Sequence, residues 1–284
     1  MVGLQVVPRV DTVSDVMTGW VVTVAPSDSL LKARDLMTRN RVSQLVVVDQ
    51  RGRSVGFISK RGIARFLLDD TTTRQLEDIP VSEASSESIP TIRPDLPVFN
   101  AARMFDTENL AYTVIANDKP LLGIMTETDL CHYFSRKWPG KFKVADFMTR
   151  DFIFAKSSYP AVHVAHAIVF RQPSVPVIDE ELVGILTLSD LLSIRERAPK
   201  AAHGRLTSKA ESDVALITTK DLMTRDPITT REGADLAQAA QIIIKEGIGS
   251  LPVVDDESRV VGLLTKHHIV EALGRIGKNI AVEA

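Results

Sequence analysis

At 284 residues the chain is long enough for one large domain or for two to four small ones, and with 44% hydrophobic residues it can bury a core. Its 34 Lys plus Arg residues against 36 Asp plus Glu exclude a bulk positive charge that would favour nucleic acid or an anionic membrane, and its single cysteine, Cys131, excludes an intrachain disulfide and a multi-cysteine metal site. No apolar run is long enough to span a membrane and no signal-peptide pattern opens the chain, so we expect a cytoplasmic protein.

The predicted elements repeat four times along the chain, and each copy has the order β-α-β-β-α. A copy opens with an extended lead-in, which carries Met-Thr in the first, third and fourth copies, at 17–18, 148–149 and 223–224. An amphipathic helix follows, with apolar residues at i, i+3 and i+4 that should face a core. Those residues are Ala33, Leu36, Met37, Ala101, Met104, Phe105, Ala165, Ile168, Val169, Ala239, Ile242 and Ile243. Two β-branched runs, as at 251–255 and 260–264, then predict a hairpin before a second helix.

A seven-residue pattern leads from the hairpin of every copy into its second helix. It reads GFISKRG at 56–62, GIMTETD at 123–129, GILTLSD at 184–190 and GLLTKHH at 262–268. All four copies keep the glycine and a hydroxyl, at Ser59, Thr126, Thr187 and Thr265. Only two copies end in an acid, Asp129 and Asp190, where the others have Gly62 and His268.

The copies are domain-sized units, because the pattern recurs about every 60 to 80 residues, at longer intervals than the repeats of solenoids and propellers. One unit is too small and too one-sided to bury its sheet alone, so we expect the first to pair with the second and the third with the fourth. The predicted domains span 1–68, 81–134, 144–195 and 219–275. The predicted linkers are 69–80, 135–143 and 196–218.

The acid of the seven-residue pattern has two interpretations. Thr-x-x-Asp before an apolar segment is typical of a helix capping box, in which the hydroxyl caps a free N–H and the acid accepts from the backbone of the Thr. However, Glu or Gln is more usual at the position of the acid, and the chain keeps the hydroxyl in four copies but the acid in only two. The pattern therefore favours capping by the hydroxyl and a ligand role for the acid.

A strand that ends in Gly and Thr and enters a helix directly suits a nucleotide. The helix N-terminus offers unpaired N–H groups and a partial positive charge to a phosphate, and the two hydroxyls of the pattern can donate to the same anion. The acid could accept from two adjacent ribose hydroxyls, a charge-assisted contact that contributes roughly 1.5–3 kcal/mol. The candidate residues are Thr126, Thr128, Asp129, Thr187, Ser189 and Asp190.

The repeated motifs resemble those of the cystathionine-β-synthase (CBS) domain family. The lead-in DLMTRDPITT at 221–230, the segment GIGSLPVVDD at 247–256 and the GLLT that follows are close to the family pattern, and the four copies cover the chain from Asp15 to about Leu273. The resemblance implies an α/β (α+β) fold of four tandem β-α-β-β-α CBS domains. These would pair as two pseudo-twofold modules, called Bateman modules, in a layout similar to the gamma subunit of AMP-activated kinase.

The resemblance also implies clefts in which the Thr and Asp of one domain face the lead-in of its partner. The cleft with Asp129 would be closed by Trp20, Val21 and Val22, and the cleft with Asp190 by Pro227 and Ile228. Where such families often have basic residues for phosphates, this chain has Ser43-Gln44 and Gly249-Ser250, which disfavours a triphosphate. The clefts at Gly62 and His268 lack the acid and should be empty or weak, leaving two nucleotide sites per chain.

The function implied by the resemblance is regulation by adenine nucleotides, AMP, ADP or ATP, without a catalytic cofactor and without catalysis. The output would pass to a separate effector protein or through self-association, and a homodimer is open. S-adenosylmethionine is an alternative ligand, and RNA or DNA binding is an alternative function. The latter would use Trp138 for stacking together with basic residues near the predicted linkers, Arg136, Lys137, Lys141, Lys143, Arg195, Arg197, Lys200, Arg205 and Lys209.

Three other side chains have chemistry of their own. His163 and His166 lie at i, i+3, a spacing that can chelate a metal, but no Cys, Asp or Glu stands beside them, so we expect a core or interface role and no metal site. Cys131 follows Asp129 on the same predicted helix. No His is placed to activate it, so we expect a buried apolar residue and not a nucleophile.

Overall fold

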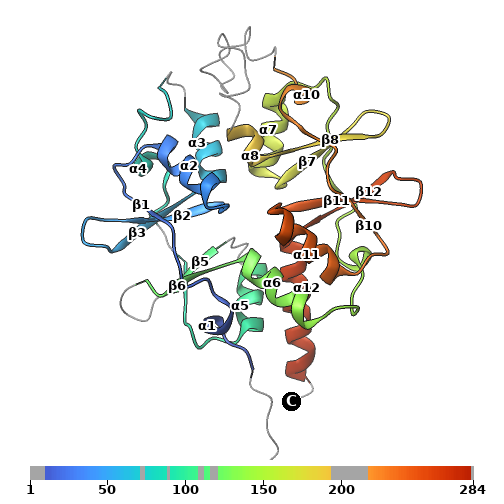
Figure 1. The fold of residues 1–284 in the computed structure, drawn as a ribbon, viewed down its shortest axis with the longest axis horizontal. Coiled ribbons are helices and arrows are strands. Elements are labelled where there is room, and N and C mark those ends of the chain that lie inside the picture. Colours follow the sequence, from blue (N-terminus) through green and yellow to red (C-terminus); the bar gives the residue numbers. More distant parts are fainter. Residues whose placement is uncertain are drawn as a thin grey trace, which may run out of the picture.

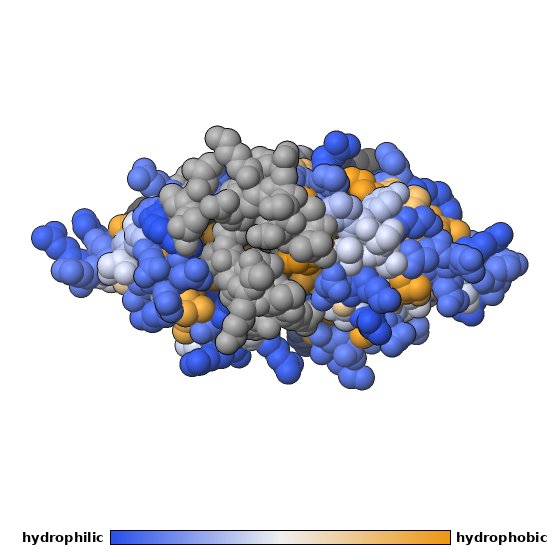
Figure 2. Space-filling view, turned by 90° about the horizontal axis from the view of Figure 1, so that it is seen from above, coloured by the Kyte–Doolittle hydropathy of each residue, from blue (hydrophilic) through white to orange (hydrophobic). Residues whose placement is uncertain are grey.

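The computed structural model describes residues 10–70, 74–87, 90–107, 112–115, 121–192 and 217–282. These residues form four three-stranded sheets with flanking helices, arranged as the four quarters of a disk (Figure 1). Seen from its edge the molecule has a flattened outline, and its described surface is mostly hydrophilic with scattered apolar residues (Figure 2). Each quarter corresponds to one copy of the predicted repeat.

The first two copies occupy one half of the disk. The first contains α1 (Val13–Val16), β1 (Thr23–Val24), α2 (Leu30–Arg39), β2 (Gln44–Val48), β3 (Ser54–Ser59) and α3 (Lys60–Asp69). The second contains α4 (Val81–Ala84), β4 (Thr91–Ile92), α5 (Val98–Thr107), β5 (Tyr112–Ile115), β6 (Gly123–Thr126) and α6 (Glu127–Lys137).

The third and fourth copies occupy the other half. The third contains η1 (Val144–Asp146), α7 (Ala161–Phe170), β7 (Ser174–Ile178), β8 (Leu182–Thr187) and α8 (Leu188–Leu192). The fourth contains α10 (Thr219–Leu222), β9 (Thr224–Arg225), β10 (Thr230–Arg231), α11 (Leu236–Glu246), β11 (Ser250–Val254), β12 (Val260–Thr265) and α12 (Lys266–Val282). The β-α-β-β-α order is thus confirmed in the first, second and fourth copies, whereas the lead-in of the third forms only one parallel bridge, between Ala155 and Val177. A short helical turn is added at the start of each lead-in.

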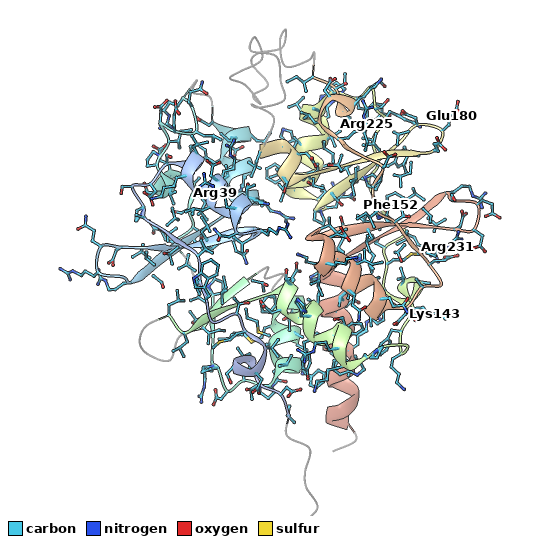
Figure 3. All side chains as sticks on the ribbon, viewed as in Figure 1. Arg39, Lys143, Phe152, Glu180, Arg225 and Arg231 are labelled. Atoms are coloured by element: carbon cyan, nitrogen blue, oxygen red, sulfur yellow. The ribbon has the colours of Figure 1, made fainter. Side chains whose placement is uncertain are left out.

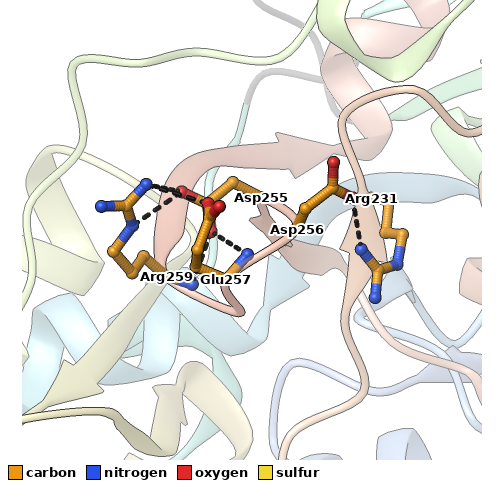
Figure 4. Close-up of polar contacts among 5 residues, drawn as sticks. All are labelled: Arg231, Asp255, Asp256, Glu257 and Arg259. Atoms are coloured by element: carbon orange, nitrogen blue, oxygen red, sulfur yellow. Dashed lines mark hydrogen bonds and ion pairs between the residues drawn. The ribbon is translucent and has the colours of Figure 1, made fainter.

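The predicted hairpin of the fourth copy is confirmed, with β11 antiparallel to β12 and β10 parallel to β11. An aspartate holds its turn: Asp255 accepts from the backbone N–H groups of Glu257 and Arg259, at 3.1 and 2.8 Å, and from the Arg259 guanidinium (Figure 4). This guanidinium holds the pKa of Asp255 below its usual value. Asp49 closes the hairpin of the first copy with Arg53 in the same way.

The helix faces follow the predicted apolar spacing. Of the twelve residues predicted to face a core, nine are buried, and Leu36, Met104 and Ile242 are half-buried and packed against a core. Residues at positions i and i+4 lie on the same side of a helix. The helical period of 3.6 residues is therefore enough to identify the buried face.

The lead-ins exchange between paired copies. Thr18 of the first copy forms a bridge with Ile124 on β6 of the second, and Ser86 of the second forms one with Phe57 on β3 of the first. In the other half, Thr149 pairs with Leu263 on β12, and β9 pairs with β8. Reciprocal exchange confirms that the first copy pairs with the second and the third with the fourth.

Lead-in exchange explains why the seven-residue pattern begins with glycine. A Cβ on Gly123 would lie 2.7 Å from the carbonyl oxygen of Thr18 and 3.0 Å from Sδ of Met17. A Cβ on Gly262 would lie 2.7 Å from Sδ of Met148. The glycine therefore contacts the Met-Thr of the partner's lead-in. The absence of a side chain at the glycine lets the lead-in cross directly over the strand.

Substituting Gly123 with Ala is expected to lower the free energy of unfolding by about 1–3 kcal/mol, because the new methyl group would overlap a backbone carbonyl that cannot move without shifting the lead-in. Urea denaturation measures the change. Gly233→Ala is the control, since a Cβ there would have no neighbour within 4 Å. Equal stability of the two variants would contradict this account of the glycine.

The described residues form two hydrophobic cores, and each of them combines copies from both halves. One combines the second and fourth copies, through α5, α6, α11 and α12, and the other combines the first and third, through α2, α3, α7 and α8. Close packing of α5 on α12 uses glycines of α12, since a Cβ on Gly277 would lie 2.6 Å from Cβ of Phe99. Sheets and lead-ins thus join the copies within a half, and helices join the halves (Figure 1).

The segments predicted as linkers contain packed residues. Leu76 and Ile79, within 69–80, are buried in the core of the first and third copies. Around 135–143, α6 continues to Lys137 and Trp138 packs against Phe99 and Phe134, with ring centroids 5.8 Å apart in both pairs. Most of 196–218 lies outside the described residues. The residue at which each domain begins or ends stays a prediction.

Candidate functional site

The first acid-bearing pattern lies where β6 ends and α6 begins. Thr126 is the N-cap of α6, and its hydroxyl accepts weakly from the backbone N–H of Asp129 at 3.4 Å. Oδ2 of Asp129 in turn accepts from the backbone N–H and the hydroxyl of Thr126, at 2.8 and 2.7 Å. Thr126 and Asp129 therefore form a complete capping box.

The other carboxylate oxygen of Asp129 faces the partner copy. Its Oδ1 accepts from the hydroxyl of Thr18 at 2.7 Å, across 111 positions of sequence. Thr18 is the lead-in residue that bridges Ile124 on β6, so backbone pairing places its side chain at the acid. The carboxylate of Asp129 thus caps its own helix and also forms a hydrogen bond with the lead-in of the paired domain.

The second acid-bearing pattern repeats this geometry at the N-terminus of α8. Oδ2 of Asp190 accepts from the backbone N–H and the hydroxyl of Thr187, at 2.9 and 2.7 Å. Its Oδ1 accepts from the hydroxyl of Thr224, on the lead-in of the fourth copy, at 3.1 Å. Asp190 is only 5% exposed, so this carboxylate depends on these hydrogen bonds in place of water.

The two copies without an acid cap their helices differently. In the first, Ser59 accepts from the backbone N–H of Gly62 at 3.0 Å. In the fourth, Nδ1 of His268 accepts from the backbone N–H of Thr265 at 3.2 Å and so takes over the capping bond of the acid. The lead-in residue Thr149, with no acid to reach, donates to the carbonyl of Asp151 at 2.9 Å.

The structure corrects our separation of the two roles. We expected the hydroxyl alone to serve the helix and the acid to be kept for a ligand. Instead, both Asp129 and Asp190 accept two hydrogen bonds from the Thr at the N-cap and one from the lead-in of the partner. The acid therefore has a structural function in both copies, whatever else it binds.

The lead-in residues predicted to close each site begin two positions after Thr18 and three positions after Thr224, the threonines that bond to the acids. Trp20 is 66% exposed, and Val21 and Val22 beside it are half-buried. Pro227 is half-buried and Ile228 is 43% exposed on the other lead-in. Exposed large apolar side chains beside polar helix N-termini are features that a flat aromatic base could contact.

The corresponding position on the third lead-in is held by Phe152, which lies where the sheets of the third and fourth copies approach each other (Figure 3). This lead-in faces the pattern with His268 and not one with an acid. Glu180, on the turn between β7 and β8, lies farther out, at the rim of the disk (Figure 3).

The sequence interpretation missed two lysines. Nζ of Lys60 donates to Oγ of Ser189 at 3.1 Å, and Nζ of Lys266 donates to Oγ1 of Thr128 at 2.9 Å. Each lysine follows the capping hydroxyl of an acid-free copy, and this shared position was the available signal. The second hydroxyl of each acid-bearing pattern is thus contacted from the opposite half of the disk.

The pKa values of His267 and His268, which are adjacent in sequence, are shifted in opposite directions. Hydrogen bonding to Glu127 raises the pKa of His267, which lies 3.4 Å from Glu127 and 3.7 Å from Asp106. Burial lowers the pKa of His268 to about 4. Protonation of His267 therefore stabilises the contact between α12 and the second copy, whereas protonation of His268 opposes folding.

Between pH 7.5 and pH 5 the folded protein should lose about 2 kcal/mol of stability through His268, since the unfolded chain binds a proton below about pH 6.5 and the folded chain does so only near pH 4. His268→Gln keeps an acceptor for the Thr265 N–H and should remove this loss. Urea unfolding at both pH values measures it, with His163→Gln, at an exposed position, as control. An unchanged pH dependence in His268→Gln would contradict the assignment.

Other candidate residues have structural roles. Cys131 is fully buried, burial raises the pKa of its thiol, and the thiol donates to the carbonyl of Lys266 at 3.8 Å, which confirms an inert apolar residue. His163 and His166 were expected to have a core or interface role; both are exposed, which corrects the core alternative, and His166 stacks on Phe170. No group of three or more metal-ligating side chains occurs among the described residues.

The predicted nucleic-acid surface is weakened by the position of Trp138. Its ring packs against Phe99, Tyr133 and Phe134, which corrects the prediction of a free stacking platform. Lys137 pairs with Asp11 at 2.9 Å, while Arg136, Lys141 and Lys143 are exposed. The remaining basic residues, Arg195, Arg197, Lys200, Arg205 and Lys209, lie outside the described residues.

Comparison with known proteins identifies the repeated unit. The family model described as "CBS domain" matches residues 13–69, 81–136, 144–197 and 220–275, most of the chain. The chain belongs to the CBS domain family. The four copies are CBS domains, and the two reciprocal pairs form the two pseudo-twofold modules.

One similar protein matches this chain over nearly the full length of both chains. The protein MJ1225 of Methanocaldococcus jannaschii is 28% identical over 268 residues, which cover 88% of this chain and 94% of MJ1225. Its crystal structure, described as a candidate archaeal homologue of g-AMPK, matches with a TM-score of 0.79 and 26% identity over 92% of this chain and 99% of that one.

Two more distant matches also cover most of the chain. A conserved protein of Pyrococcus horikoshii has a TM-score of 0.63 at 19% identity, covering 93% of this chain and all of that one, and so shares the fold. A 33.4 kDa protein of Thermofilum pendens is 24% identical over 89% of this chain and 88% of its own length. None of the helices in the described ranges combines the length and apolar character that crossing a membrane requires.

Proposed function

We propose that this CBS-domain protein binds adenine nucleotides between its paired domains and acts as a regulatory subunit or sensor without catalysis of its own. Each module would hold one nucleotide, at Asp129 in the first and at Asp190 in the second. The phosphate would lie on the N-terminus of α6 or α8, near Thr126 and Thr128 or Thr187 and Ser189. The base would lie against Trp20, Val21 and Val22, or against Pro227 and Ile228.

The observation that carries the proposal is the hydroxyl-to-carboxylate hydrogen bond that crosses each module. Thr18 donates to Asp129, and Thr224 donates to Asp190. A ribose hydroxyl would offer the carboxylate the same kind of donor in the same place, between a helix N-terminus and a lead-in with exposed apolar side chains. Full-length likeness to MJ1225, the candidate homologue of g-AMPK, gives further support.

The Thr hydroxyls give this proposal a mechanism for signalling. A nucleotide that takes over the acid must displace Thr18 or Thr224, each of which belongs to the lead-in of the partner domain. Binding would then exchange a contact within the protein for one with the ligand, and so shift the relative stability of two arrangements of the pair. The output would pass to a separate effector protein or to self-association.

Calorimetric titration of the full chain with AMP, ADP and ATP tests the proposal, with adenosine as the phosphate-free comparison and S-adenosylmethionine as the alternative ligand. We expect two molecules of at least one adenine nucleotide per chain, with Kd below about 1 mM, and weaker binding of adenosine. Bound ligand should also raise the melting temperature by mass action. Absence of saturable binding by all three nucleotides would refute the proposal.

A further inference from the structure

A glutamine side chain occupies the backbone edge of the third lead-in. Gln172 stands just after α7, and its Oε1 accepts from the backbone N–H of Ile153 at 2.7 Å. Its Nε2 donates to the backbone C=O of Ile153 and to that of Ser174, both at 2.7 Å. The flat carboxamide thus satisfies the backbone donor and the backbone acceptor of one residue at the same time.

The register of the sheets accounts for this side chain. In the first copy the equivalent lead-in residue is Val22, and its C=O accepts from the backbone N–H of Val46 on β2 at 3.3 Å. In the third copy Pro176 holds the position of Val46 in the hairpin and has no N–H to donate. Gln172 therefore supplies the donor that the strand lacks.

The fourth copy has the same proline but no such glutamine. Its strand β11 contains Pro252, and the position after its first helix is held by Ile248, whose side chain cannot donate. Among the described residues, no hydrogen bond involves the backbone N–H or C=O of Ile228, which is the lead-in residue equivalent to Ile153. The second module thus contains one filled backbone edge and one open edge.

An adenine base has the same pattern of polar groups as the carboxamide. Adenine carries its N6 amino donor beside its N7 acceptor, and the side chain of Gln172 carries its amino group beside its carbonyl oxygen. Both groups are flat, and both complement the N–H and C=O of one residue. A base against Ile228 would therefore find a free edge. A base in the cleft of His268 would find the edge of Ile153 already occupied.

We propose that Gln172 is an internal plug, a carboxamide that fills the base-binding edge of the third lead-in and excludes adenine from the cleft of His268. The inference rests on the proposed function, because it assumes that adenine nucleotides lie against the lead-ins. It gives a second reason, besides the missing acid, why this cleft would not take a nucleotide. The residue that follows the first helix of a domain then decides whether the lead-in of that domain accepts a base.

Moving the plug to the open edge tests the proposal by loss of binding. Ile248→Gln puts a carboxamide at the equivalent position of the fourth copy, where it should bond to Ile228. Calorimetric titration with AMP, ADP and ATP should then show binding at the Asp190 site at least about tenfold weaker, with the Asp129 site unchanged. Ile244→Gln is the matched control, because Ile244 packs against the same core one turn earlier, inside α11, and it should leave both sites unchanged. Unchanged binding in Ile248→Gln would overturn the proposal.

Removing the plug tests the proposal by gain of binding. His268→Asp restores the acid of the fourth pattern and should add no nucleotide site, because Gln172 still holds the edge of Ile153. Combining it with Gln172→Val, which introduces the residue found at this position in the first copy, should create one further nucleotide site per chain. A glutamine with a purely structural role would lower the melting temperature when substituted but add no site. A third site in His268→Asp alone, or none in the double variant, would overturn the proposal.

The plug and the proposed function fail in different ways. If the unsubstituted chain binds two nucleotides, and the variants neither remove one nor add one, the plug is wrong and the proposed function stands. If the unsubstituted chain binds none, the proposed function is wrong, and the double variant still decides the plug: one nucleotide gained supports it, and none overturns it. Circular dichroism checks that each variant is folded, and where one of the two plug variants does not fold, the other decides.

Discussion

Asp129→Ala is expected to lower the number of adenine nucleotides bound per chain from two to one, and Asp190→Ala to remove the other. The acid contributes a charge-assisted contact of roughly 1.5–3 kcal/mol to the ribose, so its loss should weaken that site by about 10- to 150-fold. Calorimetry separates the two sites, because each variant should leave the other module with unchanged affinity. The double variant should show no saturable binding.

The capping role of these acids calls for a control. Loss of an N-terminal capping contact alone costs about 1 kcal/mol of stability, so Asp129→Ala will also destabilise the protein. Asp146→Ala removes a comparable contact, the hydrogen bond from the backbone N–H of Lys143, on a lead-in that faces His268 and not an acid. It should lower stability and leave both nucleotides bound.

Asp129→Asn keeps the shape and one acceptor oxygen of the side chain while removing its charge, so it should fold better than Asp129→Ala and still bind nucleotide more weakly. Unchanged affinity in both variants would mean that Asp129 only caps α6 and holds Thr18. The nucleotide proposal for the first module would then be wrong, although the fold assignment would not change.

Local features of this protein could be predicted from its sequence. The apolar face of α2, for instance, follows from Ala33 and Met37, which are four residues apart and one turn of helix away from each other. Thr126 and Asp129 are three residues apart, and their capping box was among the two interpretations considered. In both cases the partners lie within one turn, so spacing alone brings them together.

Contacts between domains could not be predicted in the same way. The hydrogen bond from Thr18 to Asp129 spans 111 positions, and that from Lys266 to Thr128 spans 138. Repetition of the unit indicated which copies pair, but it did not reveal that helices of opposite modules share a core. For that reason the contacts of Lys60 and Lys266 with the opposite half were not predicted, and Trp138, in a predicted linker, was expected to be available for stacking.

Phe134→Ala is expected to lower the free energy of unfolding by about 3–5 kcal/mol, because Phe134 is fully buried and its loss leaves a cavity among packed rings. Phe134 stacks on Trp138 at 5.8 Å and lies 6.0 Å from Phe142, between ring centroids. Phe154→Ala is the control, since Phe154 is 49% exposed and its loss should cost less than about 1 kcal/mol. Urea denaturation followed by circular dichroism compares the two.

The position of this cavity also tests which parts of the chain unfold together. Phe134 belongs to the core that the second and fourth domains share, although these domains lie in different modules. We therefore expect amide hydrogen exchange in Phe134→Ala to accelerate in β6 and β12 together, more than in β2 and β8, because the shared core is the unit that loses packing. Acceleration in β6 and β2, with β12 unaffected, would instead make the module the cooperative unit. Each module would then be able to respond to its ligand alone, and the helices that join the halves could not carry a signal between the sites.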